Sequence, residues 1–255
     1  MIVLSACSFP TAPSSSARTT DAALADATRT LDAPAVTVPP SEFCQPTSGT
    51  AQNHVMACFE FEDTADDGSI HHLIAHTTDV SFVPGQIGKA LHFASTSAAD
   101  FDDSPAFDAT SLTIELWVNP SANRPATANL LDVNNQYAFQ LKSNGDLHCL
   151  LNGGKSLDGN AKLAANQWTH VACTYDAATG ESLIYANGSQ VNSDNASDNS
   201  PLATDGTTGL SLAADNPPSA GDRAPMVGLL DQVRLLDYAR AAADICTDSG
   251  SSACK

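Results

Sequence analysis

Gln167–Asp176, with the sequence QWTHVACTYD, is the stretch that decides the fold. Within it, Trp168–Tyr175 combines aromatic, β-branched and small apolar residues, which is typical of a strand. The turn-forming segment Asp176–Gly180 (DAATG) follows, and then the short run Ser182–Ala186. Two such runs separated by a short turn that contains Gly predict a β-hairpin.

The same pattern extends on both sides of this hairpin. Leu112–Val118 alternates apolar and polar residues, as a strand with one buried face does. Asn144-Gly145, a strong turn dipeptide, lies between Tyr137–Lys142 and Asp146–Leu151 and predicts a second hairpin. A final long strand is expected at Val227–Leu236. Many short strands at this spacing indicate an all-β sandwich.

Five motifs together resemble the LamG-like jelly-roll domains. They are FVPGQIGKALHF (82–93), LTIELWV (112–118), QWTHVACTYD (167–176), YANG (185–188) and GLLDQVRL (228–235). They occur in the family's order across about residues 55–246. The resemblance implies a concanavalin A-like jelly-roll sandwich of two antiparallel sheets. One short C-terminal helix is expected at Tyr238–Cys246.

The chain contains seven cysteines, of which Cys7 lies apart from the other six. An even set of six predicts three disulfides and an oxidising compartment. The resemblance implies a bridge between neighbouring strands that joins Cys149 to Cys173. Three pairings remain for Cys44, Cys58, Cys246 and Cys254; we favour the local pairs Cys44–Cys58 and Cys246–Cys254, while the crossed pairs stay open. The sequence has no CxxC pair, so zinc is not expected.

The formal net charge of −18 excludes a typical nucleic-acid binder, which needs clustered Lys and Arg. The sequence contains no run of 18 apolar residues, so it does not predict a membrane-spanning helix. The surplus of Asp over Glu favours loops rather than helices. Carboxylate and amide oxygens are also the ligands that Ca²⁺ takes, so Ca²⁺ is the one cofactor to consider.

The N-terminal sequence predicts a lipid anchor followed by a tether. Leu4–Cys7 (LSAC) resembles a bacterial lipobox, so residues 1–7 are interpreted as the remnant of a signal peptide with lipidation at Cys7. Ser8 resembles the outer-membrane sorting pattern. Residues 8–43 are rich in Ala, Ser, Thr and Pro, which predicts a disordered tether. Residues 44–255 form the expected jelly-roll domain, at a bacterial outer membrane or cell surface.

Asp231 is the first candidate metal ligand. The strand alternation places it on the same face as Leu229, Val233 and Leu235, and a carboxylate on an apolar face needs a partner. Backbone hydrogen bonds or an Arg could supply one. The resemblance to jelly-roll glycanases implies the alternative, a structural Ca²⁺ shared with Glu62 or Asp63.

A second candidate calcium site combines two segments that are rich in acid and amide groups. The resemblance to pentraxins implies that such loops meet at the rim of the sandwich, although the pentraxin ligand string itself is absent. The candidate ligands are Asp132, Asn134, Asn135, Asp215, Asn216 and Asp222. The alternative is that these residues only form turns.

Catalytic patterns are not found in the sequence. The ExDxxE strand of glycosidases with this fold is missing, and Glu115 is expected to be an exposed, isolated carboxylate. Trp117 and Trp168 are expected in the core, and His170 is expected to serve in packing and hydrogen bonding. The resulting hypothesis is a non-enzymatic, lipid-anchored surface module that binds an extracellular glycan or protein. A structural or adhesive envelope protein and a polysaccharide hydrolase or lyase are the alternatives.

Overall fold

The computed structural model describes residues 43–44, 54–123, 127–133, 136–151, 155–195, 200–202, 209–215, 224–252 and 254. The described elements are β1 (Val55–Phe59), β2 (His76–Pro84), β3 (Lys89–Phe101), η2 (Pro105–Phe107), β4 (Leu112–Pro120), β5 (Thr127–Val133), β6 (Tyr137–Lys142), β7 (Asp146–Leu151), β8 (Lys155–Lys162), β9 (Thr169–Asp176), β10 (Glu181–Ala186), β11 (Ser189–Asn195), β12 (Leu210–Leu212), β13 (Gly228–Leu236) and α2 (Ala242–Asp248). None of the described helices is long and apolar enough to span a membrane. The predicted lipobox Cys7 and the 8–42 part of the tether lie outside the described residues.

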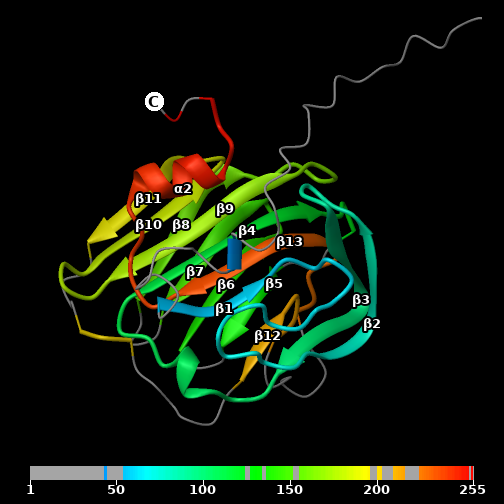
Figure 1. The fold of residues 1–255 in the computed structure, drawn as a ribbon. Coiled ribbons are helices and arrows are strands. Elements are labelled where there is room, and N and C mark those ends of the chain that lie inside the picture. The colour runs from blue at the N-terminus through cyan, green and yellow to red at the C-terminus, as the bar shows by residue number, and fades with distance from the viewer. Residues whose placement is uncertain are drawn as a thin grey trace, which may run out of the picture. The chain divides into compact units, whose positions relative to one another are not determined.

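The strands form two packed layers, as Figure 1 shows. Layer A has the order β11-β10-β9-β4-β13, with β1 added to the second half of β13. Layer B has the order β12-β5-β6-β7-β8. Strand β3 connects the layers because it pairs with β13 through Leu91–Phe93 and with β12 through Ala99–Phe101; β2 lies on its other edge. All these pairings are antiparallel, so the predicted fold class is confirmed.

The core lies between the two layers and follows the strand alternation. Leu112, Ile114, Leu116 and Val118 of β4 are fully buried and pack in one cluster with Phe139 of β6. The opposite side chains of each strand form the outer faces, which we call the outer face of layer A and the outer face of layer B.

One disulfide crosses this core. Cys149 of β7 and Cys173 of β9 are bonded, as expected, and both belong to the buried cluster. The expected reason was wrong, because the two strands are not hydrogen-bonded neighbours: β7 lies in layer B and β9 in layer A. The bond therefore joins the two layers face to face. The other disulfides, Cys44–Cys58 and Cys246–Cys254, are the local pairs.

The predicted hairpins agree closely with the structure. Strands β6 and β7 have the bounds expected around Asn144-Gly145, and Gly145 adopts a φ of 87° in the turn. The C-terminal helix α2 begins four residues later than expected, at Ala242 rather than Tyr238. The residues between β13 and α2 are not helical. Among them, the Tyr238 carbonyl accepts a hydrogen bond from Thr113 Oγ1 of β4.

Candidate functional site

A buried cluster of charges lies on the outer face of layer A. Glu115 points away from the core on β4, where His170 of β9 approaches its Oε1 through Nε2 at 3.1 Å. Its Oε2 accepts hydrogen bonds from Arg234 at 3.1 Å and from Arg240. Both arginines also contact Asp248 of α2. Glu115 was expected to be exposed, but its side chain is only 1% exposed because these groups cover it.

The cluster keeps Glu115 ionised despite its burial. Burial alone would raise the pKa of this carboxyl. The hydrogen bond from His170 and the charges of Arg234 and Arg240 outweigh that effect and lower the pKa to about 2. The carboxylate is therefore negatively charged near neutral pH and is paired with His170, Arg234 and Arg240.

Aromatic residues on this face also differ from the expectation. Trp117 is partly buried outside the core, where its ring meets that of His170 edge to face at 5.2 Å. Trp168 is partly buried as well. The alternation of β4 explains the position of Trp117, since Leu116 and Val118 are the residues that face the core.

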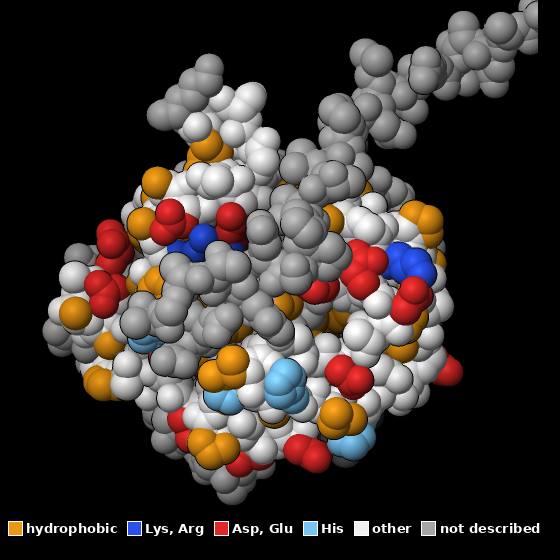
Figure 2. Space-filling model, viewed as in Figure 1, with side chains coloured by type: hydrophobic (Ala, Val, Ile, Leu, Met, Phe, Trp, Pro, Cys, Tyr) orange, Lys and Arg blue, Asp and Glu red, His pale blue; other side chains and the backbone are white. Residues whose placement is uncertain are grey.

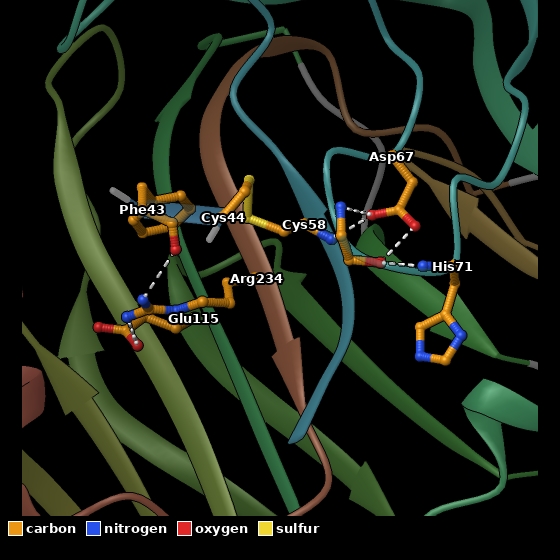
Figure 3. The surroundings of a disulfide bond; sticks show 8 residues. Phe43, Cys44, Cys58, Asp67, His71, Glu115 and Arg234 are labelled. Atoms are coloured by element: carbon orange, nitrogen blue, oxygen red, sulfur yellow. Dashed lines mark hydrogen bonds and ion pairs between the residues drawn. A yellow bond between two sulfur atoms is a disulfide. The ribbon is translucent and has the colours of Figure 1, made fainter. Parts of the chain in front are cut away.

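The N-terminal end of the domain covers the same face (Figure 3). The Phe43 ring stacks on the Arg234 guanidinium at 4.4 Å, and the Phe43 carbonyl accepts a hydrogen bond from this arginine. The next residue, Cys44, is bonded to Cys58 of β1. The disulfide thus holds Phe43 over Arg234, which connects the N-terminal segment, the sheet and α2.

A loop beside this disulfide is organised by one buried carboxylate. Asp67 Oδ1 accepts hydrogen bonds from the backbone N–H groups of Cys58 and Ser69, and Oδ2 accepts one from the Ser69 hydroxyl (Figure 3). The loop that Asp67 organises exposes the side chains of Ile70 and Ile74. His71 and His72 are exposed on the same loop.

The helix α2 completes the cover. Ile245 packs on Ala172 and Tyr185, which are outward-facing residues of β9 and β10. Figure 1 shows α2 lying over the β10–β11 end of layer A, and in Figure 2 basic atoms are flanked by acidic atoms beside it. This part of the outer face is therefore occupied by the chain itself.

Asp231 and Glu62 meet at the turn between β2 and β3. Asp231 Oδ2 accepts a hydrogen bond of 2.9 Å from the Ile87 N–H, and Glu62 Oε1 accepts one of 3.0 Å from the Lys89 N–H. A Cβ at Gly85 would collide with the Asp231 carboxylate, and one at Gly88 with that of Glu62. Only a turn with glycine at both positions lets the two carboxylates approach the backbone this closely.

The face assigned to Asp231 from the sequence was wrong. Leu230, Val233 and Leu235 are the core residues of β13, while Asp231 pairs with outward-facing Trp117. A bulge with Gln232 at φ 48° inverts the alternation between them. Asp231 is nevertheless fully buried, because the 85–88 turn covers it.

The electrostatics of this turn suit a cation. Burial and the nearby Glu62 charge raise the pKa of Asp231 to about 7, and the same two causes raise the pKa of Glu60 to about 7. Asp231 Oδ1 is buried without a hydrogen-bond partner among the described residues. The described part of the chain contains no group of three or more His, Cys, Asp or Glu side chains that could hold a metal ion. Backbone carbonyls and water would therefore have to supply the remaining ligands.

The second candidate calcium site is not assembled by the described residues. Asp132 lies inside β5 rather than in a loop, and it is 6% exposed opposite Ser211 of β12. The chain after β12 continues antiparallel to β5, since the Ala213 N–H donates to the Leu130 carbonyl. Asp215 therefore lies toward the N-terminal end of β5, whereas Asp132 lies next to Val133 at the C-terminal end. Asn134, Asn135, Asn216 and Asp222 lie outside the described residues.

The outer face of layer B carries a line of polar side chains that the sequence analysis missed. Asn129, Gln140, His148 and Asp158 are successive cross-strand partners on β5, β6, β7 and β8. Asp158 is 59% exposed, and Lys142 and His148 both contact its Oδ1 at 2.5 Å. These residues are distant in sequence and only the strand register aligns them, so no motif could have revealed the line.

The sequence belongs to the concanavalin A-like lectin/glucanases superfamily, since the Laminin_G_3 family matches residues 93–246. This family covers the strands from the middle of β3 to the end of β13 and part of α2. Comparison with curated proteins gave no match.

Solved structures share the fold at low sequence identity. Domain 4 of AbnA, a GH43 extracellular arabinanase from Geobacillus stearothermophilus solved with arabinotriose, aligns with a TM-score of 0.62 and 19% identity over 78% of this chain and 98% of that domain. The binding domain of Paraclostridial Mosquitocidal Protein 1 aligns with a TM-score of 0.62 and 16% identity, over 78% of this chain and 52% of that one. A structure of botulinum neurotoxin type C, whose cell entry depends on interaction with two ganglioside molecules, aligns with a TM-score of 0.60 and 14% identity, over 81% of this chain and 52% of that one. The chain thus spans about half the length of the toxin chains.

Proposed function

We propose that this chain is a non-enzymatic recognition module that binds a glycan or a protein outside the cell. The observation that carries the proposal is the contrast between the two outer faces. The chain's own ends cover part of layer A, whereas layer B carries partly exposed polar side chains on β6 and β7 and the 59% exposed Asp158 on β8. The binding domains among the structural relatives support the same role.

The alternative of a hydrolase or lyase is disfavoured by the state of the carboxylates on the central strands of layer A. Glu115 is held by two arginines, and Asp231 is buried beneath a turn. Among the described residues, Glu115 and Asp231 are both buried rather than facing each other across an open cleft, whereas most glycoside hydrolases use two carboxylates that flank the scissile bond. A glycan array probed with the full chain, with and without calcium, tests the binding role. Release of shorter products from a bound glycan, followed by mass spectrometry, would instead establish an enzyme.

Calcium is the proposed resident ion, held by Asp231 and Glu62 at the 85–88 turn. The fit rests on the partnerless Asp231 oxygen, on the glycines that open the turn, and on the left-handed backbone of Phe61 and Gln232 beside it. Bound there, Ca²⁺ would supply charge compensation and connect β13 to the β2–β3 turn. The rim residues around Asp132 and Asp215 are not part of this proposal.

Thermal unfolding tests the ion. A ligand that binds only the folded state at a hundredfold excess over its Kd stabilises it by about 2.7 kcal/mol, so millimolar calcium should raise the Tm and chelator should reverse the gain. Magnesium should act less, because its coordination is stricter. Asp231→Asn should abolish the calcium effect, whereas the matched variant Asp63→Asn on the exposed Lys89 pair should keep it. An equal gain with sodium at matched ionic strength would contradict a site.

The lipid anchor on Cys7 and the tether are likewise proposed, with the outer membrane or cell surface of a bacterium as the location. They rest on the LSAC sequence and on the composition of residues 8–43. Expression with a lipoprotein signal peptide should yield protein that partitions into detergent and carries lipid. Unchanged partitioning of Cys7→Ala would refute the anchor.

A further inference from the structure

The cross-strand line on the outer face of layer B consists of Asn129, Gln140, His148 and Asp158, and we call it the polar row. Each member pairs with the next across β5 to β8. The neighbouring residues Phe139, Leu141 and Cys149 are buried in the core, so alternation turns the row outward. Neighbouring strands lie about 4.8 Å apart, and the part of the row from β6 to β8 therefore spans about 10 Å.

Contacts within the row fix its polar atoms in place. Gln140 Nε2 donates to Asn129 Oδ1 at 2.8 Å, and Asn129 is only 3% exposed. The Asn129 N–H in turn donates to the Ala224 carbonyl at 2.9 Å, which closes this end of the row. Asn129 thus positions Gln140. Of the other members, Asp158 is 59% exposed, Gln140 is partly buried, and the His148 side chain is 17% exposed.

At the β8 end of the row, two side chains share the acceptor Asp158 Oδ1. His148 Nδ1 and Lys142 Nζ both contact Asp158 Oδ1. Within the described residues, His148 Nε2 and Asp158 Oδ2 make no hydrogen bond. Together with the Gln140 carbonyl oxygen, they present acceptors beside the N–H groups of Gln140 and Lys142. A hydroxyl group both donates and accepts a hydrogen bond, so a surface with mixed donors and acceptors suits the hydroxyl groups of a sugar.

The charge of the row argues for an uncharged ligand. The Lys142 charge offsets that of Asp158, and the amides are neutral, although the chain as a whole carries −18. An anionic glycan would be repelled by that overall charge, and a basic peptide would find the carboxylate already paired. Next to the row, Leu150 is 42% exposed and offers apolar surface to the C–H face of a sugar ring.

We propose that the polar row is the ligand-binding site of this module, and that it takes an uncharged oligosaccharide lying across β6 to β8. Gln140 donates to and accepts from its hydroxyl groups, His148 Nε2 and Asp158 Oδ2 accept from them, and Lys142 contacts Asp158 Oδ1. This inference rests on the proposed function, because it specifies where and what that module binds.

The test is an NMR titration of the full chain. Arabinotriose, maltotriose, cellotriose and chitotriose are each added at millimolar concentration, and the backbone and side-chain amide signals are followed. A bound sugar should shift the side-chain amide signals of Gln140 and Asn129. Gln140→Ala and His148→Ala should each raise the Kd about tenfold, which corresponds to about 1.4 kcal/mol. The matched variants Gln190→Ala on exposed β11 and His71→Ala on the β1–β2 loop should bind as the wild type does.

The outcomes separate this inference from the proposed function. If a sugar binds but the row variants keep the wild-type Kd, the row is not the site and the module role survives. If the wild type binds none of the four sugars, this inference is overturned; the glycan array decides separately whether the module role survives. Should His148→Ala misfold, judged by its amide spectrum, Asp158→Asn replaces it, because its side chain is mostly exposed.

Discussion

Two clusters with similar composition lie on opposite outer faces of the sandwich. On layer A, Glu115 is joined by two arginines and His170, and its side chain is 1% exposed. On layer B, Asp158 is joined by Lys142 and His148, and its side chain is 59% exposed. The difference is the cover: α2 and Phe43 cover the first cluster. The buried Glu115 carboxylate is therefore occupied by contacts within the protein, whereas the exposed Asp158 carboxylate is accessible to a ligand.

The largest difference should appear when each carboxylate is removed. Glu115→Ala leaves two largely buried arginines with Asp248 as their one remaining acidic partner among the described residues, so we expect a loss of about 3–5 kcal/mol in the free energy of unfolding. Asp158→Ala should cost less than about 1 kcal/mol, because the Asp158 side chain is 59% exposed and water can solvate the Lys142 charge that the change leaves unpaired. Urea unfolding of both variants measures this contrast. Equal losses would show that burial does not distinguish the clusters.

The free energy of unfolding should also depend on pH through the buried Glu115. The folded-state pKa of Glu115 is about 2, below its ordinary value of 4.5. Its contribution to stability is therefore present above about pH 4.5 and is lost as the pH falls toward 2. A shift of this size corresponds to about 3 kcal/mol. Between pH 6 and pH 2.5, the wild type should lose more stability than Glu115→Gln by roughly this amount. Parallel curves for the two proteins would contradict the lowered pKa.

The Cys44–Cys58 bond tests how the cover of layer A is maintained. Replacing both cysteines by Ala should cost roughly 2–3 kcal/mol, since the bond restricts the unfolded chain. It should also release Phe43 from Arg234, so hydrogen exchange should increase at β13 and β4 while β6 and β7 keep their protection. The matched pair Cys149→Ala and Cys173→Ala should increase exchange in both layers. Uniform exchange in the first variant would argue against a local cover.

The sequence predicted the strands and the fold better than it predicted the two faces. Asn144-Gly145 and the alternation of Leu112–Val118 are local signals, and local turn and strand geometry determined those elements. The burial of Glu115 depends on Arg240 and Asp248, more than a hundred residues away, and alternation alone could not predict it. Asp231 was assigned to the wrong face because a single bulged residue, Gln232, inverts the pattern.

The same reasoning explains the outcome for the predicted ligands. Asp231 and Glu62 do meet, because the 85–88 turn brings both to one backbone segment. The resemblance to pentraxins placed Asp132 in a rim loop with Asn134 and Asn135, yet β5 continues through Val133. The polar row needs the register of four strands, and its two ends, Asn129 and Asp158, are 29 positions apart in the sequence.

The smallest expected effect is the coupling between charges, and it sharpens the comparison most. A double-mutant cycle of Lys142→Ala and Asp158→Ala should give a coupling energy of about 0.5 kcal/mol, because both side chains are substantially exposed. Molar salt should remove it, since the screening length falls to about 3 Å. The matched cycle of Arg240→Ala and Glu115→Ala should give a coupling of more than about 1.5 kcal/mol that salt changes little, because water and ions cannot reach Glu115. A large, salt-resistant coupling on layer B would mean that its partners hold Asp158 as tightly as Glu115 is held, and the polar row would then not be free to bind a ligand.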